Sequence, residues 1–310
     1  MRLVLAIVGP TASGKSELAM DLAEQFNGEI INYDSVQIFR HLNIGTAKPS
    51  AEERARVPHH LIDIREPTEV YTAGNYQRDA REILKDITDR GKLPILVGGT
   101  GLYLLALTEG LFSGPERSGY WRDRLQKSAD KKGREHLHRL LIRLDPKSAE
   151  RIMPRDTQKI IRALEVRLQT GKALTHHFQE KARDPLTGYK FNFIGLNPER
   201  AELYARIDER VVKMFKAGFV NEVRQLLDNG LPRNAKALEA IGYRQVLAYL
   251  DSCSRREDTI HIIQRDTRRY AKRQLTWFRR QADVKWFNGP GDNSEIKEMV
   301  RQFVRQLLIF

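Results

Sequence analysis

A phosphate-binding pattern near the start of the chain is the clearest chemical signal in the sequence. Residues 9–16 read Gly-Pro-Thr-Ala-Ser-Gly-Lys-Ser, which fits the P-loop spacing of Gly, four residues, Gly, Lys and Ser or Thr. In such a loop backbone N–H groups turn towards phosphate oxygens, the lysine adds a positive charge, and the last hydroxyl can hold Mg²⁺. The pattern predicts a pyrophosphate or nucleotide site, with Ser16 as the magnesium ligand, formed by Gly9, Pro10, Thr11, Ala12, Ser13, Gly14, Lys15 and Ser16.

A P-loop indicates that a phosphate is bound but not which reaction takes place. Carboxylates elsewhere in the sequence must distinguish between the possible reactions. Nucleotide hydrolases usually present an aspartate at the end of a second apolar strand. Here the apolar run at residues 94–97 leads into Gly98-Gly99-Thr100-Gly101, which holds no carboxylate. Asp34 instead follows the strand expected at residues 29–32, where it could accept a proton from an attacking nucleophile. On spacing alone, a helix N-cap or a residue that holds a magnesium-bound water is an alternative role for Asp34.

Short apolar runs alternate with segments in which apolar residues have helical spacing. This pattern indicates an α/β fold with a doubly wound parallel sheet of the P-loop type. Ligands of such sheets gather at the carboxyl ends of the strands, where the P-loop, Asp34 and the turn at Gly98 all stand. We expect strands at residues 3–8, 29–32, 94–97 and 191–196, and helices at residues 17–26, 73–90, 199–228, 237–250, 255–280 and 294–308.

The strands stop at residue 114, which predicts a mostly helical, basic insertion at residues 114–189 within a core of residues 1–113 and 190–310 with C-terminal helices. Residues 1–113 hold 12 basic against 15 acidic residues, and the rest of the chain holds 41 against 25. Such asymmetry indicates that one part handles a small ligand while the other meets a polyanion such as nucleic acid. Ordinary solvated helix faces are the alternative.

Composition narrows the class of protein further. With 41% apolar and 30% charged residues the 310-residue chain has enough material for a packed core. The single cysteine, Cys253, cannot form an internal disulfide or a cysteine-built zinc site, so a reducing cytoplasm is the simplest compartment. No apolar run approaches the roughly 18 residues of a membrane helix, and the apolar start is too short for a signal peptide.

Beyond the P-loop, further stretches resemble the successive signatures of bacterial tRNA dimethylallyltransferase, also called tRNA isopentenyltransferase. The order and the spacing agree, and the resemblance covers nearly the whole chain. The stretches are Asp34-Ser-Val-Gln37, Ile44-Gly-Thr-Ala-Lys-Pro49, His59-His-Leu-Ile-Asp63, Val97-Gly-Gly-Thr-Gly-Leu-Tyr103, Asp156-Thr-Gln-Lys-Ile-Ile-Arg-Ala-Leu-Glu165, Ala240-Ile-Gly-Tyr-Arg-Gln245 and Tyr270-Ala-Lys-Arg-Gln-Leu-Thr-Trp-Phe278.

The resemblance implies transfer of a dimethylallyl group from dimethylallyl pyrophosphate to N6 of adenine 37, beside the tRNA anticodon, with pyrophosphate leaving. Asp34 matches the family's catalytic aspartate, and an exocyclic amine needs such a base because it is a poor nucleophile. Thr100 and Arg122 match positions that meet the tRNA near the reacting base. The P-loop, with Mg²⁺ at Ser16, would then stabilise the charge of the leaving pyrophosphate.

The resemblance also implies which residues contact the tRNA anticodon stem-loop, whose target base must be splayed out to react. These are Asp34, Ser35, Val36, Gln37, Thr100, Arg122, Gln158, Lys159, Ile160, Ile161, Arg162, Glu239, Ala240, Ile241, Gly242, Tyr243 and Arg244. Separately, residues 265–280 form a dense basic tract interleaved with Tyr270, Trp277 and Phe278. RNA stacking is one role for its aromatic residues, but their helical spacing favours a packed core.

Three other functions are compatible with parts of the pattern. An adenylate isopentenyltransferase would use the same donor on a free nucleotide, a small-molecule kinase would place ATP in the P-loop, and an RNA-binding module would have no turnover. The 13 basic against 6 acidic residues at 117–159 favour a macromolecular acceptor. Family analogy favours a monomer.

Overall fold

The chain folds into two compact units. The structure, a computed structural model, describes residues 1–310 apart from residues 112–113, 181–183, 253–254, 282 and 310, so Cys253 lies outside the described residues. The sheet unit comprises Met1–Thr108 and Leu186–Phe310, and the helical unit comprises Glu109–Pro185. We expected the insertion at residues 114–189. The division falls a few residues earlier at both ends because Leu186 N–H already bonds to the Thr108 carbonyl, at 3.3 Å, within the sheet unit.

The sheet unit is built on six parallel strands in the order β3-β2-β4-β1-β5-β6. The central strand β1 is buried along most of its length because it pairs with β4 on one side and with β5 on the other. The strand bounds are β1 Arg2–Val8, β2 Gly28–Asn32, β3 His59–His60, β4 Leu93–Val97, β5 Tyr189–Leu196 and β6 Val284–Phe287.

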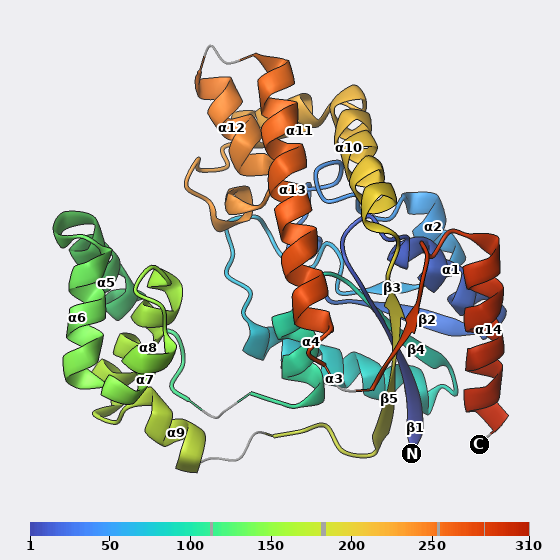
Figure 1. The fold of residues 1–310 in the computed structure, drawn as a ribbon, viewed down its shortest axis with the longest axis horizontal. Coiled ribbons are helices and arrows are strands. Elements are labelled where there is room, and N and C mark those ends of the chain that lie inside the picture. The colour runs from blue at the N-terminus through green and yellow to red at the C-terminus, as the bar shows by residue number, and fades with distance from the viewer. Residues whose placement is uncertain (112–113, 181–183, 253–254, 282, 310) are drawn as a thin grey trace. The chain divides into compact units, whose positions relative to one another are not determined.

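Helices cover both faces of the sheet, which confirms the expected doubly wound α/β class (Figure 1). Alternate residues of β1 point to opposite faces, as in any strand. Leu5 and Ile7 pack with α1 (Lys15–Gln25) and α14 (Ser294–Ile309). On the other face, Val4, Ala6 and Val8 belong to a core that includes α3 (Ala73–Asp89) and α4 (Gly101–Thr108).

The helices after β5 are shorter and more numerous than the sequence indicated. The single helix expected at residues 199–228 is wrong, because Gly218 adopts φ 96° and separates α10 (Arg200–Lys216) from α11 (Phe219–Asp228). Gly242, also at φ 96°, divides the next expected helix into a 3₁₀ turn at Lys236–Glu239 and α12 (Tyr243–Asp251). Left-handed backbone ends a right-handed helix, and glycine adopts it at low cost.

The long helix α13 (Arg256–Phe278) packs against α10 and α12. Its Phe278 is 1% exposed and belongs to the same core as α3 and α4. Trp277 is partly buried against that core. The packed-core role that the spacing favoured for the aromatic residues of this tract is therefore confirmed for Phe278 and Trp277.

The helical unit has its own core. Its helices are α5 Gly119–Lys132, α6 Arg134–Leu144, α7 Pro146–Arg151, α8 Thr157–Thr170 and α9 Leu174–Glu180. Leu137, Leu141, Ile160 and Leu164 are 0% exposed and pack at its centre. Across the described part of both units, none of the helices has the length and apolarity to cross a membrane.

Candidate active site

The P-loop between β1 and α1 has the curled backbone that its motif predicts. Gly9, Ala12 and Gly14 have φ values of 147°, 64° and 80°. Side chains would not fit at the two glycines, since a Cβ on Gly9 would lie 2.9 Å from the carbonyl oxygen of Leu196 and one on Gly14 would lie 2.7 Å from the backbone nitrogen of Gly291. The loop is thus enclosed by chain segments from far along the sequence.

Three hydrogen bonds from distant residues hold the loop. Thr11 N–H donates to Gln274 Oε1 at 2.8 Å, Arg206 Nε donates to the Ala12 carbonyl at 3.0 Å, and Gly291 N–H donates to the Ser13 carbonyl at 2.9 Å. They come respectively from α13, from α10 and from the segment before α14. Sequence analysis gave no role to Arg206, Gly291 or Gln274, although Gln274 lies within the stretch 270–278 that resembles the family.

Lys15 supplies a recessed positive charge at the end of the loop. Its Nζ donates to the Pro10 carbonyl at 2.7 Å. Part of its surface opens into a cavity, yet surrounding atoms remove much of its hydration. Burial is the main cause that lowers the pKa of Lys15 to about 8, and the positive charge of Arg210 lowers it further, against the attraction of Asp34 and Glu17. A bound anion would stabilise the ammonium form.

Arg210 of α10 is a second recessed cation, which sequence reasoning missed. Burial also lowers the pKa of this guanidinium, which Glu17 and Asp34 partly offset. Within the described residues no carboxylate forms an ion pair with Arg210. A signal for it exists in the sequence, because Arg206 and Arg210 are four residues apart and therefore lie on one face of a helix.

The P-loop and both cations line one cavity of about 830 Å³ in the sheet unit. Asp34, Ser35, Val36 and Gln37 also line it, together with Gly98 and Gly99. Further parts of its wall come from α10, from α13, from residues 45–49 and from residues 239–243. Segments that the sequence assigned to phosphate and to tRNA therefore share one hollow, at the carboxyl ends of β1, β2 and β4.

Asp34 uses one carboxylate oxygen to shape its own turn. Oδ1 accepts hydrogen bonds from Val36 N–H at 2.9 Å and from Gln37 N–H at 3.4 Å. Residues 35–38 form turns rather than a helix, so Asp34 is not a helix N-cap. Oδ2 would lie 3.3 Å from a Cβ on Gly99 and receives no hydrogen bond from the described residues. One oxygen thus fixes the side chain while the other is left to interact with a ligand.

Thr100 supports the same turn. Its Oγ1 accepts from Ser35 N–H at 2.9 Å and donates to Ser35 Oγ at 3.0 Å, and its own N–H bonds to the Tyr33 carbonyl at 3.2 Å. These bonds tie the turn after β4 to the turn after β2. The structure therefore brings Thr100 together with Asp34.

Arg122 belongs to the helical unit, where it pairs with a buried carboxylate. Its Nε lies 2.9 Å from Glu165 Oε1 and its terminal nitrogen 3.0 Å from Oε2. Arg162 donates to the same Oε2 at 2.8 Å. Burial alone would raise the pKa of Glu165, but these two guanidinium groups and Ser118 N–H lower it below its usual value. Arg122 and Arg162 are thus held in place by one carboxylate.

The other expected tRNA contacts divide into exposed and buried side chains. Gln158 and Lys159 are exposed on α8, whereas Ile160 is 0% and Ile161 5% exposed, so both isoleucine side chains pack in the core. In the sheet unit, Glu239, Ala240, Ile241 and Gly242 line the cavity. Tyr243 is buried and donates to Glu222 Oε1 at 2.6 Å, and exposed Arg244 lies 3.3 Å from Asp266.

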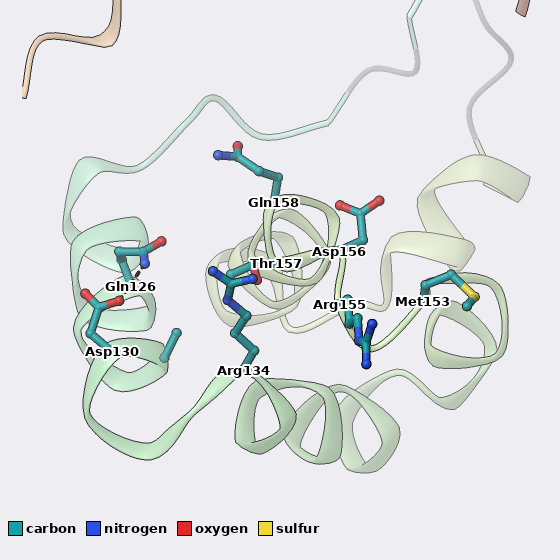
Figure 2. A pocket seen from close by; sticks show the side chains of 9 residues that line it. Gln126, Asp130, Arg134, Met153, Arg155, Asp156, Thr157 and Gln158 are labelled. Carbon is teal, nitrogen blue, oxygen red and sulfur yellow. Dashed lines mark hydrogen bonds between the residues drawn. The ribbon is translucent and has the colours of Figure 1, made fainter. Parts of the chain in front are cut away.

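A second hollow, of about 650 Å³, lies in the helical unit (Figure 2). Arg134 and Arg155 extend into it from the start of α6 and from the turn before α8. Both are exposed, and no described residue forms an ion pair with either. Met153 at its rim is 73% exposed. Asp130 and Asp156 line the hollow as well, and Asp156 pairs with Lys159 at 2.6 Å. The hollow thus holds two arginine residues, two aspartates and an apolar side chain.

Magnesium would need help from a phosphate ligand here. The described residues contain no group of three or more His, Cys, Asp or Glu side chains that could hold a metal ion. Ser16 lines the cavity and presents a hydroxyl oxygen, the kind of donor that Mg²⁺ accepts alongside phosphate oxygens and water. The residues present therefore fit a magnesium–pyrophosphate complex rather than a metal held by protein alone.

Comparison with known proteins decides the family. Residues 37–281 match the model of the family described as IPP transferase. The chain belongs to the IPP transferase family. It is accordingly a transferase enzyme.

Relatives across the family cover nearly the whole chain. The tRNA dimethylallyltransferase of Koribacter versatilis is 50% identical over 98% of both chains, and that of Geobacter sulfurreducens is 47% identical over 97% of this chain and 96% of the relative. A tRNA isopentenylpyrophosphate transferase structure from Bacillus halodurans matches with TM-score 0.72 and 39% identity over 98% of this chain and 96% of the other. A eukaryotic dimethylallyltransferase acting on tRNA matches with TM-score 0.80 and 27% identity over 99% and 80%.

Proposed function

We propose that this IPP transferase moves the dimethylallyl group of dimethylallyl pyrophosphate to N6 of adenine 37 in tRNA and releases pyrophosphate. The observation that carries the proposal is the cavity of the sheet unit, which the P-loop, two recessed cations and Asp34 line together. The name of close relatives, tRNA dimethylallyltransferase, supports dimethylallyl as the transferred group and tRNA as the acceptor.

The residues of the cavity suit each part of this transfer. The bond between the allylic carbon and the pyrophosphate oxygen breaks, and its electron pair leaves with the pyrophosphate. A carbon–nitrogen bond forms to N6, whose proton passes to the Asp34 carboxylate. Lys15, Arg210 and the P-loop amides stabilise the growing negative charge of the leaving group. Positive charge on the recessed lysine and arginine costs free energy without an anion, so pyrophosphate is a well-matched ligand.

Magnesium is part of the proposal, with Ser16 as its protein ligand. Bound there, it would neutralise part of the pyrophosphate charge. The loop itself keeps the phosphate oxygens oriented through N–H groups whose positions are fixed by Gln274 and Gly291.

The RNA substrate would meet positive charge on the helical unit. That unit contains 18 basic and 11 acidic residues, among them the unpaired Arg134 and Arg155 of the second hollow. Lys and Arg side chains near phosphates release counterions on binding, which favours association with RNA. We expect the enzyme to act as a monomer in the cytoplasm, and light scattering of the purified protein tests the first of these expectations.

Incubation with labelled dimethylallyl pyrophosphate, Mg²⁺ and unmodified tRNA tests the proposal. We expect label on adenine 37, located by mass spectrometry of the anticodon loop. Label on free AMP alone would indicate an adenylate isopentenyltransferase. Phosphate transfer from ATP would indicate a kinase, and RNA binding without any transfer would indicate a binding module.

Asp34→Asn is the matched variant in the same assay. It keeps the shape of the side chain and removes the base, so we expect tRNA affinity to stay nearly unchanged while kcat falls by about two orders of magnitude. Turnover close to that of the wild type would remove Asp34 from the mechanism.

A further inference from the structure

Gln274 is a buried amide whose two ends bond to two different parts of the cavity wall. It lies on α13 and is 5% exposed. Its Oε1 accepts from Thr11 N–H of the P-loop at 2.8 Å. Its Nε2 donates to the Gly99 carbonyl, in the turn after β4, at 3.0 Å. One side chain therefore joins the loop assigned to pyrophosphate to the turn next to Asp34.

The Gly99 end of this link leads directly to the proposed base. Gly99 precedes Thr100, which bonds to Ser35 and so holds the turn that carries Asp34. A Cβ on Gly99 would lie 2.6 Å from Gln274 Nε2 and 3.3 Å from Asp34 Oδ2. Gly99 thus lies closely between the Gln274 amide and the Asp34 carboxylate. A displacement of the Gly99 carbonyl would therefore shift the residues that surround Asp34.

Only an amide satisfies both partners at once. Thr11 N–H needs an acceptor, and the Gly99 carbonyl accepts both from Gln274 Nε2 and from the Tyr270 hydroxyl, at 3.2 Å. An amide offers an acceptor and a donor in a fixed geometry. A carboxylate at this position would still accept from Thr11 N–H. Its other oxygen would face the Gly99 carbonyl oxygen, and the two would repel each other. An apolar side chain would leave Thr11 N–H without its acceptor and the Gly99 carbonyl with the Tyr270 hydroxyl but without the amide donor.

We infer that Gln274 is a positioning residue, which sets the distance between the P-loop and the turn carrying Asp34 and so aligns the leaving group with the attacking amine. The inference rests on the proposed function. It assigns to α13 a part in the reaction that is separate from its exposed arginine residues. Transfer rates are sensitive to such alignment, because a misplacement of about 1 Å can lower a rate by about 100-fold.

The test compares Gln274→Glu and Gln274→Met with the wild type. Gln274→Glu keeps the acceptor for Thr11, so we expect the Kd of pyrophosphate to stay within about twofold while kcat falls by about 10- to 100-fold. Gln274→Met loses both bonds, so both quantities should worsen. A kcat within about twofold of the wild type for both variants would overturn the inference.

Lowering the pH supplies a readout that lost stability alone would not produce. When the carboxylate introduced by Gln274→Glu takes up a proton, its hydroxyl can donate to the Gly99 carbonyl as the amide did. The ratio of variant kcat to wild-type kcat should therefore rise as the pH is lowered from about 8 to about 6, the range into which burial moves a carboxyl group. A ratio that stays flat would contradict the assigned role of the Gly99 bond.

Gln264→Glu is the matched control on the same helix. Gln264 is 8% exposed and also uses both ends, bonding to the Asp208 carbonyl at 3.1 Å and to His261 at 3.2 Å, but it contacts neither the P-loop nor Gly99. We expect it to lower the unfolding midpoint and leave kcat unchanged. A loss of kcat equal to that of Gln274→Glu would overturn the inference. The activity of the wild-type protein tests the proposed function separately. If the wild type does not transfer the dimethylallyl group, the proposed function is refuted, whereas the variants test only the role of Gln274.

Discussion

At the scale of single residues, the charge of Lys15 depends on pH in a range that assays reach. Burial and Arg210 lower its pKa to about 8, so the ammonium is present below that pH and is lost above it. The electrostatic attraction between Lys15 and pyrophosphate therefore also depends on pH. It is strong at lower pH and becomes weaker as the pH rises.

We therefore predict that the affinity for pyrophosphate decreases above a pH of about 8, by up to about tenfold per pH unit as the ammonium is lost. Isothermal titration at pH values on both sides of that pKa measures the effect. Lys15→Arg is the control, because a guanidinium stays charged over this range and pyrophosphate itself titrates identically in both experiments. An equal decrease in the variant would show that Lys15 is not its source.

The residues that could be predicted from the sequence are those that belong to a motif of neighbouring positions. The P-loop motif needs only eight neighbouring positions, and its curled backbone has the expected form. Gln274, by contrast, contacts Thr11 across 263 positions, and nothing in the sequence near either residue records that contact. Arg210 was missed for a related reason, since a helix of mixed charges does not reveal which of its cations faces a cavity.

At the scale of elements, glycine conformation decides where the C-terminal helices end. Gly218 has φ 96°, and no atom lies within 4 Å of a Cβ built on it, so a substitution there would meet backbone strain but no steric clash. The sequence shows a glycine within a helical pattern, which a helix can tolerate, and does not reveal its φ. That is why α10 and α11 were expected as one helix.

Gly218→Ala should lower the free energy of unfolding by about 1–2 kcal/mol, the usual cost of left-handed backbone for an L-residue. Gly74→Ala is the control in the same unit. Gly74 lies in α3 without a positive φ, and a Cβ would be no closer than 3.7 Å to Thr72 Oγ1. We expect it to stabilise by up to about 1 kcal/mol. Urea unfolding checks both, and shifts in the same direction would contradict the strain argument.

Elements of ordinary length were predicted well, and very short ones were not. The strands β1 and β4 are nearly continuous apolar runs because helices cover both faces of the sheet, whereas β2 and β5 also contain polar residues. The edge strand β3 has only two residues, and β6 has four, of which Lys285 is exposed. Periodicity cannot be read over so few positions, and pairing with a neighbouring strand is what makes them strands.

At the scale of the whole molecule, phosphate chemistry and the densest excess of positive charge belong to different compact units. The P-loop cavity lies in the sheet unit, and the hollow with Arg134 and Arg155 lies in the helical unit. A substitution in one unit can therefore weaken RNA binding and leave the pyrophosphate site intact.

Arg134→Ala combined with Arg155→Ala should flatten the dependence of log Kd for tRNA on log salt by about one to two units, because two phosphate contacts are lost. Filter binding at several salt concentrations measures the slope, and the Kd of pyrophosphate should not change. Lys147→Ala with Arg151→Ala removes the same charge from exposed positions of the helical unit outside the hollow. An equal flattening by this control pair would indicate general charge rather than the hollow.

The hydrogen bond from Gly291 to Ser13 has a consequence for the newly made protein. Translation produces the P-loop long before residue 291, which follows β6 by only a few residues. The helical unit, made of one continuous stretch, can fold while the sheet still waits for β5 and β6. The pyrophosphate loop therefore acquires this support only after residue 291 has been made, so a nascent chain that is shorter lacks a finished site.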